Sequence, residues 1–224
     1  MTQTESVRQT GVGAQRGLKI MRKIIHNIKN LILKATSDVK YKGEYTLTFA
    51  DITSHPDGPK LERKVVEAAK QGWTEYRKAL DNLHAKCATR KIVIENLVVN
   101  DGLNVIARIL AGDTTYTGKI THCALGTGTA PVAAGDTALG TEVFRRAVTS
   151  NVFSANQSFI STFFLAADDA DTYNEVGHYI DGDASVDSGQ LYSRIEEAST
   201  SELPVTKTLT DTLTVDYKVT QSNA

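Results

Sequence analysis

The first stretch of this sequence that could bind a ligand is the glycine-rich segment GTGTAP at residues 126–131. Glycine lets backbone N–H groups approach an anion closely, so such a segment could bind a phosphate group. It lacks the Lys-Ser/Thr ending of a P-loop, and its glycines do not have the GxGxxG spacing of dinucleotide-binding loops. We therefore expect a loop that connects two strands, and no cofactor.

Acidic side chains at alternate positions later in the chain have the spacing of the first half of a calcium-binding loop. The alternating residues are Asp181, Asp183, Ser185 and Asp187. Such a loop also needs a glycine at its sixth position and an acid at its twelfth, and these positions hold Val186 and Tyr192. The two cysteines, Cys87 and Cys123, form no CxxC pair, and no Cys/His cluster has zinc-ligand spacing. The sequence thus predicts a hydrated turn, two reduced thiols and no metal site.

The histidines do not belong to an identifiable catalytic set. His122 and the threonines near it supply no nucleophile with both a base and an orienting group. His178 alternates with Val176 and Ile180, a pattern typical of a partly buried, structural imidazole. We expect no catalytic residues, no enzymatic activity and no small-molecule substrate.

Charge and hydropathy narrow the class of protein further. The net charge is −1, but Lys and Arg outnumber Asp and Glu in residues 1–90, and the acids dominate residues 91–224. Such polarity favours two regions that face different partners, or each other in neighbouring subunits. No stretch has the ~20 apolar residues of a membrane-spanning helix, and the polar N-terminus lacks the apolar core of a secretory signal. The sequence predicts a protein made and kept in a cytosol, with no membrane span.

An amphipathic pattern with a basic face runs through residues 17–35. Its apolar side chains recur at steps of three and four residues, which indicates a helix. They are Leu18, Met21, Ile25, Ile28 and Ile32. Such a helix can pack on its own protein or on a sister subunit, or it can bind nucleic acid or an anionic membrane surface. Packing on its own protein or on a sister subunit is the preferred interpretation, so binding of nucleic acid is not expected.

The clearest helical pattern covers residues 60–88. Its apolar side chains are spaced alternately by three and four residues, as in the seam of a coiled coil or helical bundle. They are Val66, Ala69, Trp73, Tyr76, Leu80, Leu83 and Cys87. We expect Trp73 and Leu80 to lie in a buried seam, either in an αα-hairpin with the helix at 17–35 or between subunits.

Period-two alternation dominates the rest of the chain, with one earlier strand at residues 45–49. Further strands are predicted at 91–99, 119–125, between 148 and 163, and at 175–180, 190–195 and 212–219, with short helices at 102–110 and 137–146. Short strands separated by polar turns are typical of an antiparallel sandwich. The expected fold is α+β. A basic N-terminal helical region with one short strand (residues 1–90, coiled coil or hairpin) precedes an acidic antiparallel β-sandwich assembly domain (residues 91–224).

Four segments of the second half occur in an informative order: ALGTGTAPVAAGDTALGTEVFRR, NEVGHYIDG, LYSRIEE and VTKTLTDTLTVDYKV. This succession, over about residues 96–220, resembles a module of the tail-collar and tail-fibre attachment family of tailed-bacteriophage virion proteins. The matching positions are Gly126, Gly128, Asp136, Leu139, Glu142, Arg145, Glu175, Gly177, Leu191, Arg194 and Lys207. In fibre proteins the module usually precedes a long shaft, whereas here it stands last, which favours assembly within a particle over receptor recognition.

The resemblance implies a non-enzymatic structural component of a bacteriophage or phage-like particle, made in the bacterial host cytoplasm and located in the virion. It would mediate subunit assembly or attachment in the tail, baseplate or neck. Its partners would be other virion proteins and further copies of itself, a trimer being one option. The alternatives are a head-associated minor or decoration protein, and a nucleic-acid- or membrane-binding accessory that acts through the basic helix at 16–34. A carbohydrate-binding module is a third alternative, because sandwiches often host one.

Four of the matching positions, Glu142, Arg145, Glu175 and Arg194, are charged residues flanked by apolar ones. A guanidinium that leaves from a partly buried surface needs a carboxylate to offset its desolvation. We therefore expect at least one Glu–Arg pair of this set to close the loop at residues 126–135 onto the β-structure, in an architectural role.

Overall fold

The computed structural model describes residues 39–197 and 200–223. The helix predicted at 17–35, with the basic segment 16–34, lies outside the described residues. Residues Tyr41–Ser222 form a compact unit. The elements in chain order are β1 (Val39–Asp51), the 3-10 helix η1 (Ile52–Ser54), α2 (Gly58–Ala69), α3 (Trp73–Lys86), β2 (Ala88–Val98), α4 (Asn100–Leu110), β3 (Ile120–Gly126), β4 (Glu142–Ala147), β5 (Ser150–Ser154), β6 (Gln157–Phe164), β7 (Thr172–Tyr173), β8 (Glu175–Ile180), β9 (Gln190–Glu196), β10 (Val205–Thr206) and β11 (Asp211–Asn223).

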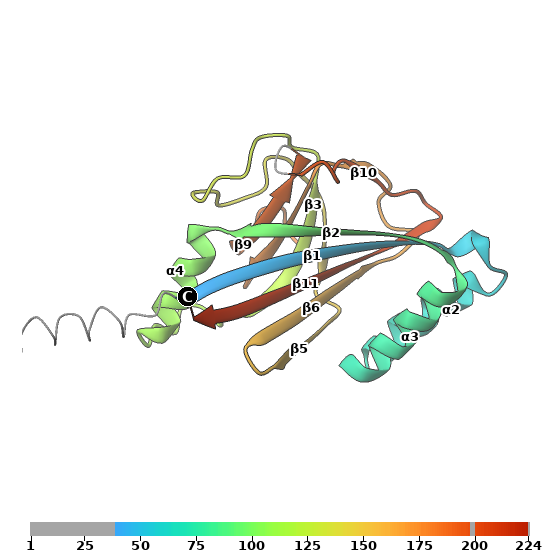
Figure 1. The fold of residues 1–224 in the computed structure, drawn as a ribbon, viewed down its shortest axis with the longest axis horizontal. Helices are drawn as coiled ribbons and strands as arrows, with labels where there is room; N and C mark the ends of the chain where they lie inside the picture. The colour runs from blue at the N-terminus through green and yellow to red at the C-terminus, as the bar shows by residue number, and fades with distance from the viewer. Residues whose placement is uncertain (1–38, 198–199, 224) are drawn as a thin grey trace, which may run out of the picture. The chain divides into compact units, whose positions relative to one another are not determined.

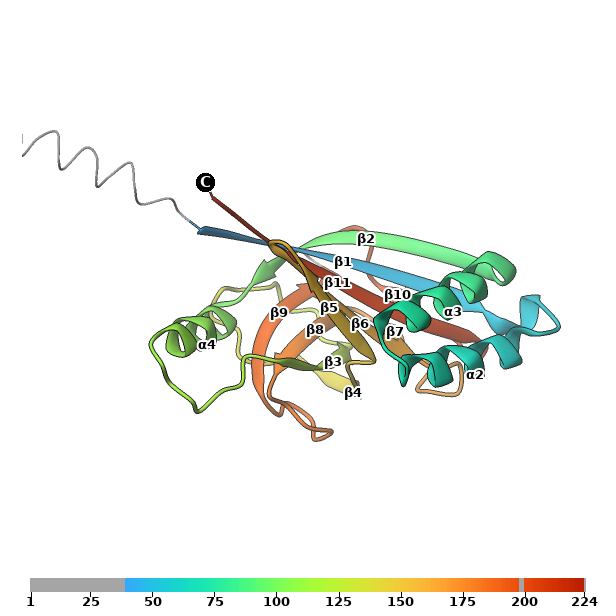
Figure 2. The same ribbon diagram turned by 90° about the horizontal axis from the view of Figure 1, so that it is seen from below.

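Nine of the described strands form one sheet, in the order β4-β3-β8-β9-β2-β1-β11-β6-β5, and β7 pairs with β10 in a small second sheet. The long strand β2 joins the two halves of the large sheet. It pairs antiparallel with β1 from Ala88 to Asn96, and with β9 through Leu97 and Val98. In Figures 1 and 2 the strands of the β3-β8-β9 half run steeply across those of the β1-β11-β6 half. The expected α+β fold with antiparallel strands is observed. The expected sandwich of two packed sheets is not, because nine of the described strands continue through β2 into one bent sheet.

The two edges of this sheet come together where β4 leads into β5. The backbone N–H of Val148 donates to the carbonyl of Thr121 in β3, at 2.8 Å. The next N–H, that of Thr149, donates to the carbonyl of Ser161 in β6, at 2.9 Å. The chain therefore passes from one half of the sheet to the other within two residues.

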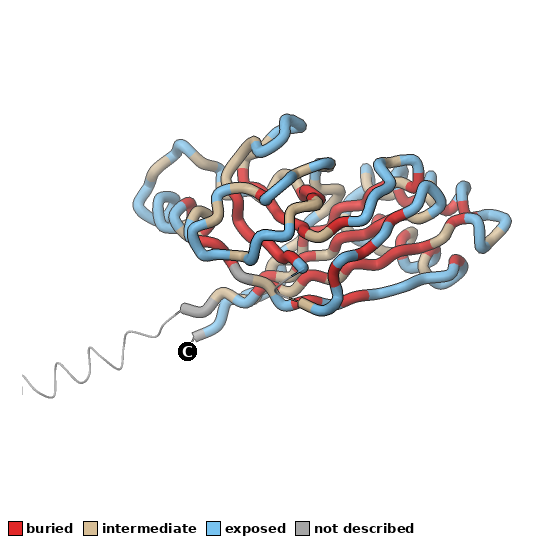
Figure 3. Tube along the Cα trace, turned by 90° about the horizontal axis from the view of Figure 1, so that it is seen from above, coloured by how far each residue is buried: buried red, intermediate tan, exposed pale blue. Residues whose placement is uncertain are grey.

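The main hydrophobic core takes side chains from both halves of the sheet. Tyr45 and Leu47 of β1 are fully buried with Val176 of β8 and Ile195 of β9. Buried stretches follow the strands, and exposed ones follow the loops that connect them (Figure 3). The alternation that predicted a strand at 45–49 is confirmed, because alternate side chains of β1 face this core.

A buried histidine in this core makes stability depend on pH. The Nδ1 atom of His178 lies 2.9 Å from the Tyr45 hydroxyl, and its ring stacks on Tyr217 at 4.9 Å between centroids. Its Nε2 atom has no hydrogen-bond partner among the described residues. Burial lowers the pKa of His178 from 6.5 to about 3. The expectation of a structural imidazole at His178 is confirmed, but the side chain is fully buried and not partly buried as expected.

We expect acidification to destabilise the fold through His178. The unfolded chain takes up the proton near pH 6.5 and the folded chain only near pH 3, so the stability is fully present above pH 6.5 and falls as the pH drops toward 3. The loss should reach about 2 kcal/mol at pH 5. Urea unfolding should give a lower free energy of unfolding at pH 5 than at pH 7.5, and this difference between the two pH values should be smaller in His178→Gln. The same substitution at His55, in the turn after η1, should leave it unchanged; an equal effect of both substitutions would contradict the assignment.

The helical pattern at residues 60–88 is two helices. The chain turns at Gly72, whose φ of 104° belongs to the left-handed region that favours glycine. Helices α2 and α3 therefore form a hairpin with each other, inserted between β1 and β2. The prediction of one continuous helix at 60–88 is wrong, because the heptad pattern continues across a residue that ends the first helix.

The side chains of the predicted seam separate accordingly. Tyr76, Leu80 and Leu83 are fully buried with Phe163 of the sheet, so α3 packs on the sheet as well as on α2. Val66 shares the heptad position of Leu80 but is 38% exposed. The coiled-coil interpretation is therefore corrected: Leu80 lies in the core of the compact unit. Trp73, expected in the same buried seam, packs against this cluster but is only partly buried.

Two further predictions differ from the structure. The short helix expected at 137–146 is absent, and its second half is the strand β4, paired with β3. The domain boundary expected between residues 90 and 91 falls inside β2, which pairs with β1 along most of its length. The change in charge therefore does not mark a division of the compact unit. The strands at 91–99 and 119–125 and the helix at 102–110 are confirmed, with small shifts of their ends.

Candidate functional site

One face of β3, β8 and β9 points away from the main core and is covered by the chain between β3 and β4, residues 127–141. Leu139 from this loop is buried with Ala124, Tyr179 and Leu191 of the sheet. It lies over Gly177, where an added Cβ would come within 2.8 Å of the Leu139 side chain. Glycine at position 177 therefore makes room for the loop.

The carboxylate of Glu175, in β8, attaches this loop to the sheet. Backbone N–H groups donate to it from Gly128 (3.0 Å) and Thr141 (2.7 Å) to Oε1, and from Gly140 (2.9 Å) to Oε2. The guanidinium of Arg194, in β9, donates to Oε2 from Nε at 2.9 Å and from Nη2 at 2.8 Å. The side chains of Glu175 and Arg194 are 0% and 3% exposed. Donors on both oxygens offset the desolvation of the buried ions.

The two glycines of the GTG segment are required by the same carboxylate. A Cβ added at Gly126 would lie 2.5 Å from Glu175 Oε1 and 2.6 Å from the carbonyl of Thr141. A Cβ added at Gly128 would also lie 2.5 Å from Glu175 Oε1. The glycines thus allow the backbone to lie directly against the buried acid.

Arg194 extends the attachment toward the middle of the loop. Its Nη1 donates to Asp136 at 2.6 Å, and its Nη2 donates to the carbonyl of Ala130 at 2.9 Å. Glu196, also in β9, accepts from the backbone N–H of Val132 at 3.3 Å. We call Glu175, Arg194 and Asp136 the Glu175 clamp. The expectation that a Glu–Arg pair closes this loop onto the β-structure is confirmed.

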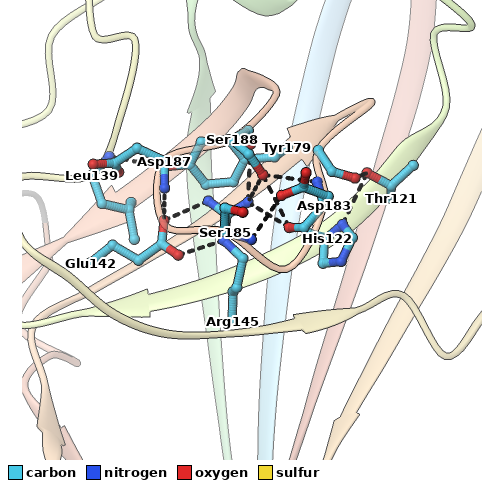
Figure 4. Close-up of polar contacts among 11 residues, drawn as sticks. Thr121, His122, Leu139, Glu142, Arg145, Tyr179, Asp183, Ser185, Asp187 and Ser188 are labelled. Carbon is cyan, nitrogen blue, oxygen red and sulfur yellow. Dashed lines mark hydrogen bonds and ion pairs between the residues drawn. The ribbon is translucent and has the colours of Figure 1, made fainter.

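The other two of the four charged positions, Glu142 and Arg145, also pair with each other, and this pair fixes a different loop (Figure 4). Arg145 Nη2 donates to Glu142 at 2.6 Å, and both side chains are almost completely buried. Arg145 Nη1 donates to the carbonyls of Asp183 (3.1 Å) and Ser188 (3.0 Å), and its guanidinium lies over the ring of Tyr179. We call Glu142 and Arg145 the Arg145 clamp, since the pair holds the loop between β8 and β9.

A β-bulge brings the two members of the Arg145 clamp to the same side of β4. Residues three apart in a regular strand point to opposite faces. In the pairing of β4 with β3, Glu142 lies opposite Gly126 and Phe144 lies opposite Leu125, which leaves Val143 as an extra residue. The short helix expected at 137–146 would have placed the two residues on one helical turn, whereas the bulged strand brings them together instead.

Two acidic residues of the β8–β9 loop have pKa values shifted in opposite directions. Burial, followed by the charge of Glu142, raises the pKa of Asp187. Hydrogen bonds from Ser185 and Ser188 lower the pKa of Asp183. Asp183 Oδ1 accepts from the backbone N–H of Ser185 at 2.7 Å, so this acid is engaged within its own turn.

Three residues singled out in the sequence lie apart from the two clamps. Trp73 and Leu80 belong to the α2–α3 hairpin. Lys207, between β10 and β11, is buried, and its ammonium lies 3.2 Å from the carbonyls of Ala166 and Asp168. Burial lowers the pKa of Lys207, opposed by the charge of Asp168. Lys207 therefore secures the turn after β6.

These contacts decide what the clamps can do chemically. The loop N–H groups that could have received a phosphate donate to the protein's own carboxylate, Glu175. Among the residues that the structure describes, no group of three His, Cys, Asp or Glu side chains could hold a metal ion. In the same part of the chain, no helix is long and apolar enough to cross a membrane. The clamps hold loops in position, and this is the activity that their geometry supports.

Several members of this site were not identified from the sequence. Tyr179 accepts from the backbone N–H of Leu139 at 3.0 Å and contacts Arg145, so it connects the loop at 127–141 with the Arg145 clamp. Ser188 receives a hydrogen bond from Arg145 at 2.8 Å on its hydroxyl. The alternation of Tyr179 with His178 in β8 indicated only that the two residues face opposite sides. Comparison with protein families, with curated proteins and with solved structures gave no match for this chain.

Proposed function

We propose that this chain is a non-enzymatic structural component of a bacteriophage or phage-like particle, and that it mediates subunit assembly or attachment through the β-rich unit at residues 41–222. One observation carries the proposal. The positions that resemble the tail-collar and tail-fibre attachment module, among them Gly126, Gly128, Asp136, Glu175 and Arg194, meet in the Glu175 clamp. A shared motif that converges on one scaffold supports a shared architecture.

The clamps also favour binding of partners over chemistry. They hold the loops 127–141 and 181–189 in one conformation before any partner arrives. A surface that is ordered in advance loses less entropy on binding, which increases affinity. The tail, baseplate or neck is the preferred location, with a head-associated minor or decoration role as the alternative.

The test is to locate the chain in particles from the organism or virus that encodes it. Mass spectrometry of purified particles should detect it in fixed stoichiometry with the major virion proteins, and a cryo-EM map should contain density for residues 41–222. Normal particles that lack the chain, from cells that express it, would overturn the proposal.

The competing function is a nucleic-acid-binding accessory that uses the basic segment 16–34. A protein that neutralises several phosphates loses affinity steeply as salt rises. We expect the full chain to show no binding to duplex DNA at near-physiological salt in a fluorescence anisotropy titration. A sequence-independent, salt-sensitive complex in the micromolar range would reverse the order of the two proposals.

A further inference from the structure

The edge strands of the large sheet are β4 and β5. They differ in how readily each could pair with a further strand. β4 carries a bulge at Val143 and the charged residues Glu142, Arg145 and Arg146. Bulges and charges on an edge strand hinder pairing with another strand. β5 has the sequence SNVFS, without charge or proline, and its register with β6 is uninterrupted. β5 is the outermost strand in Figure 1 and lies in front in Figure 2.

A large apolar side chain stands on this open edge. Phe153 in β5 is 83% exposed. It borders a cavity of about 320 Å³ that is lined mainly by apolar side chains, among them Ile106, Ile120, Ile160 and Val219. Asn151, two residues earlier in β5, also lines this cavity. An open edge strand, an exposed aromatic ring and an apolar cavity therefore meet at one place.

The β5–β6 hairpin is held in place at its tip. The backbone N–H of Gln221, in β11, donates to the carbonyl of Asn156 at 3.0 Å, and the Asn156 amide donates to the carbonyl of Gln221. Ser154 and Gln157 pair on either side of the two-residue turn. The edge is thus ordered before any partner binds.

We propose that β5 pairs antiparallel with β5 of a second copy of this chain, about a two-fold axis that passes beside Val152. This register places Val152 opposite itself and Phe153 opposite Asn151 of the partner subunit. Directly opposite side chains in an antiparallel pair lie about 4.5–5.5 Å apart at Cβ. Each Phe153 ring then reaches the rim of the other subunit's cavity, and the large sheet continues from one subunit into the next.

The charge distribution favours a second copy as the occupant. Residues 150–158 contain no charged side chain, so two identical strands can meet there without like-charge repulsion. A two-fold interface must be complementary to itself. Here the exposed ring and the cavity that receives it belong to the same surface. The inference does not depend on the particle assignment, since the pairing can be measured on the isolated protein.

A register-specific crosslink tests the pairing. Val152→Cys should form a disulfide-linked dimer under mild oxidation, because the proposed axis places the two thiols within reach of each other. The native thiols, Cys87 and Cys123, are buried, which keeps them out of this reaction. Val143→Cys on the opposite edge is the matched control and should stay monomeric on a non-reducing gel.

Sedimentation equilibrium of the full chain provides the second measurement. The wild type should show a dimer, and Phe153→Lys should raise its dissociation constant about tenfold or more, since aromatic anchors carry much of the affinity at an interface. Three outcomes would overturn the proposal. They are a wild-type chain that stays monomeric, a dimer that Phe153→Lys leaves unchanged while Val152→Cys fails to crosslink, and a Phe153 that becomes buried only when another particle protein is added.

Discussion

Replacing Glu175 with alanine is expected to lower the free energy of unfolding by about 4 kcal/mol, because it leaves a buried guanidinium without its main partner. The substitution also removes the acceptor of three loop N–H groups, those of Gly128, Gly140 and Thr141. Arg194→Ala should cost less, about 3 kcal/mol, since Glu175 keeps those three donors. The double variant should cost less than the sum, since no unpaired charge remains.

Urea unfolding of the four proteins gives the stabilities, and hydrogen exchange at Gly128, Gly140 and Thr141 reports whether the loop detaches. Glu95→Ala is the control, because Glu95 pairs with Lys42 on the surface, where both side chains are more than half exposed. It should change stability by no more than about 0.5 kcal/mol. If the double variant loses as much free energy of unfolding as the two single variants together, Glu175 and Arg194 act independently.

Leu80→Asp is expected to destabilise the fold by about 5 kcal/mol, since it combines loss of a buried apolar side chain with burial of a polar one. Val66→Asp should have little effect. The two residues occupy the same heptad position, but Leu80 is fully buried and Val66 is 38% exposed. A coiled coil along residues 60–88 would penalise both substitutions alike.

Thermal unfolding followed by circular dichroism distinguishes a hairpin packed on the sheet from a coiled coil along residues 60–88. A large drop in melting temperature for Leu80→Asp, with a near wild-type value for Val66→Asp, is the pattern that the hairpin on the sheet requires. Similar drops for both variants would contradict the packing of α3 described above.

Local patterns in the sequence determined most of the secondary structure. Alternation of Tyr45, Leu47 and Phe49 with polar residues predicted β1, because alternate side chains of a strand face one core. Strands β2 and β3 and helix α4 were also predicted from short stretches of sequence, with small shifts of their ends. Antiparallel β-structure and the architectural use of a Glu–Arg pair could also be predicted, the first from short strands with polar turns and the second from charged residues with apolar neighbours.

Other features were decided only by tertiary contacts. The heptad pattern at 60–88 continues through Gly72, but the chain reverses at this glycine. The apolar face of α3 then packs on both α2 and the sheet. Residues 142–147 have a helical spacing of charges, yet pairing with β3 makes them a strand. The change in charge after residue 90 suggested a boundary, and the pairing of β1 with β2 crosses it.

The two clamps show the same division between local pattern and tertiary contact. By itself, the sequence determined which residue types are involved: glycines that permit close approach of the backbone, and acids and arginines that need partners when buried. Only the tertiary structure decided which atoms meet. Glu175 binds the N–H of Gly128, 47 positions away in the chain, because β3, β8 and β9 are neighbours in the sheet. Strand order depends on contacts between distant segments, and no local pattern of residues encodes it.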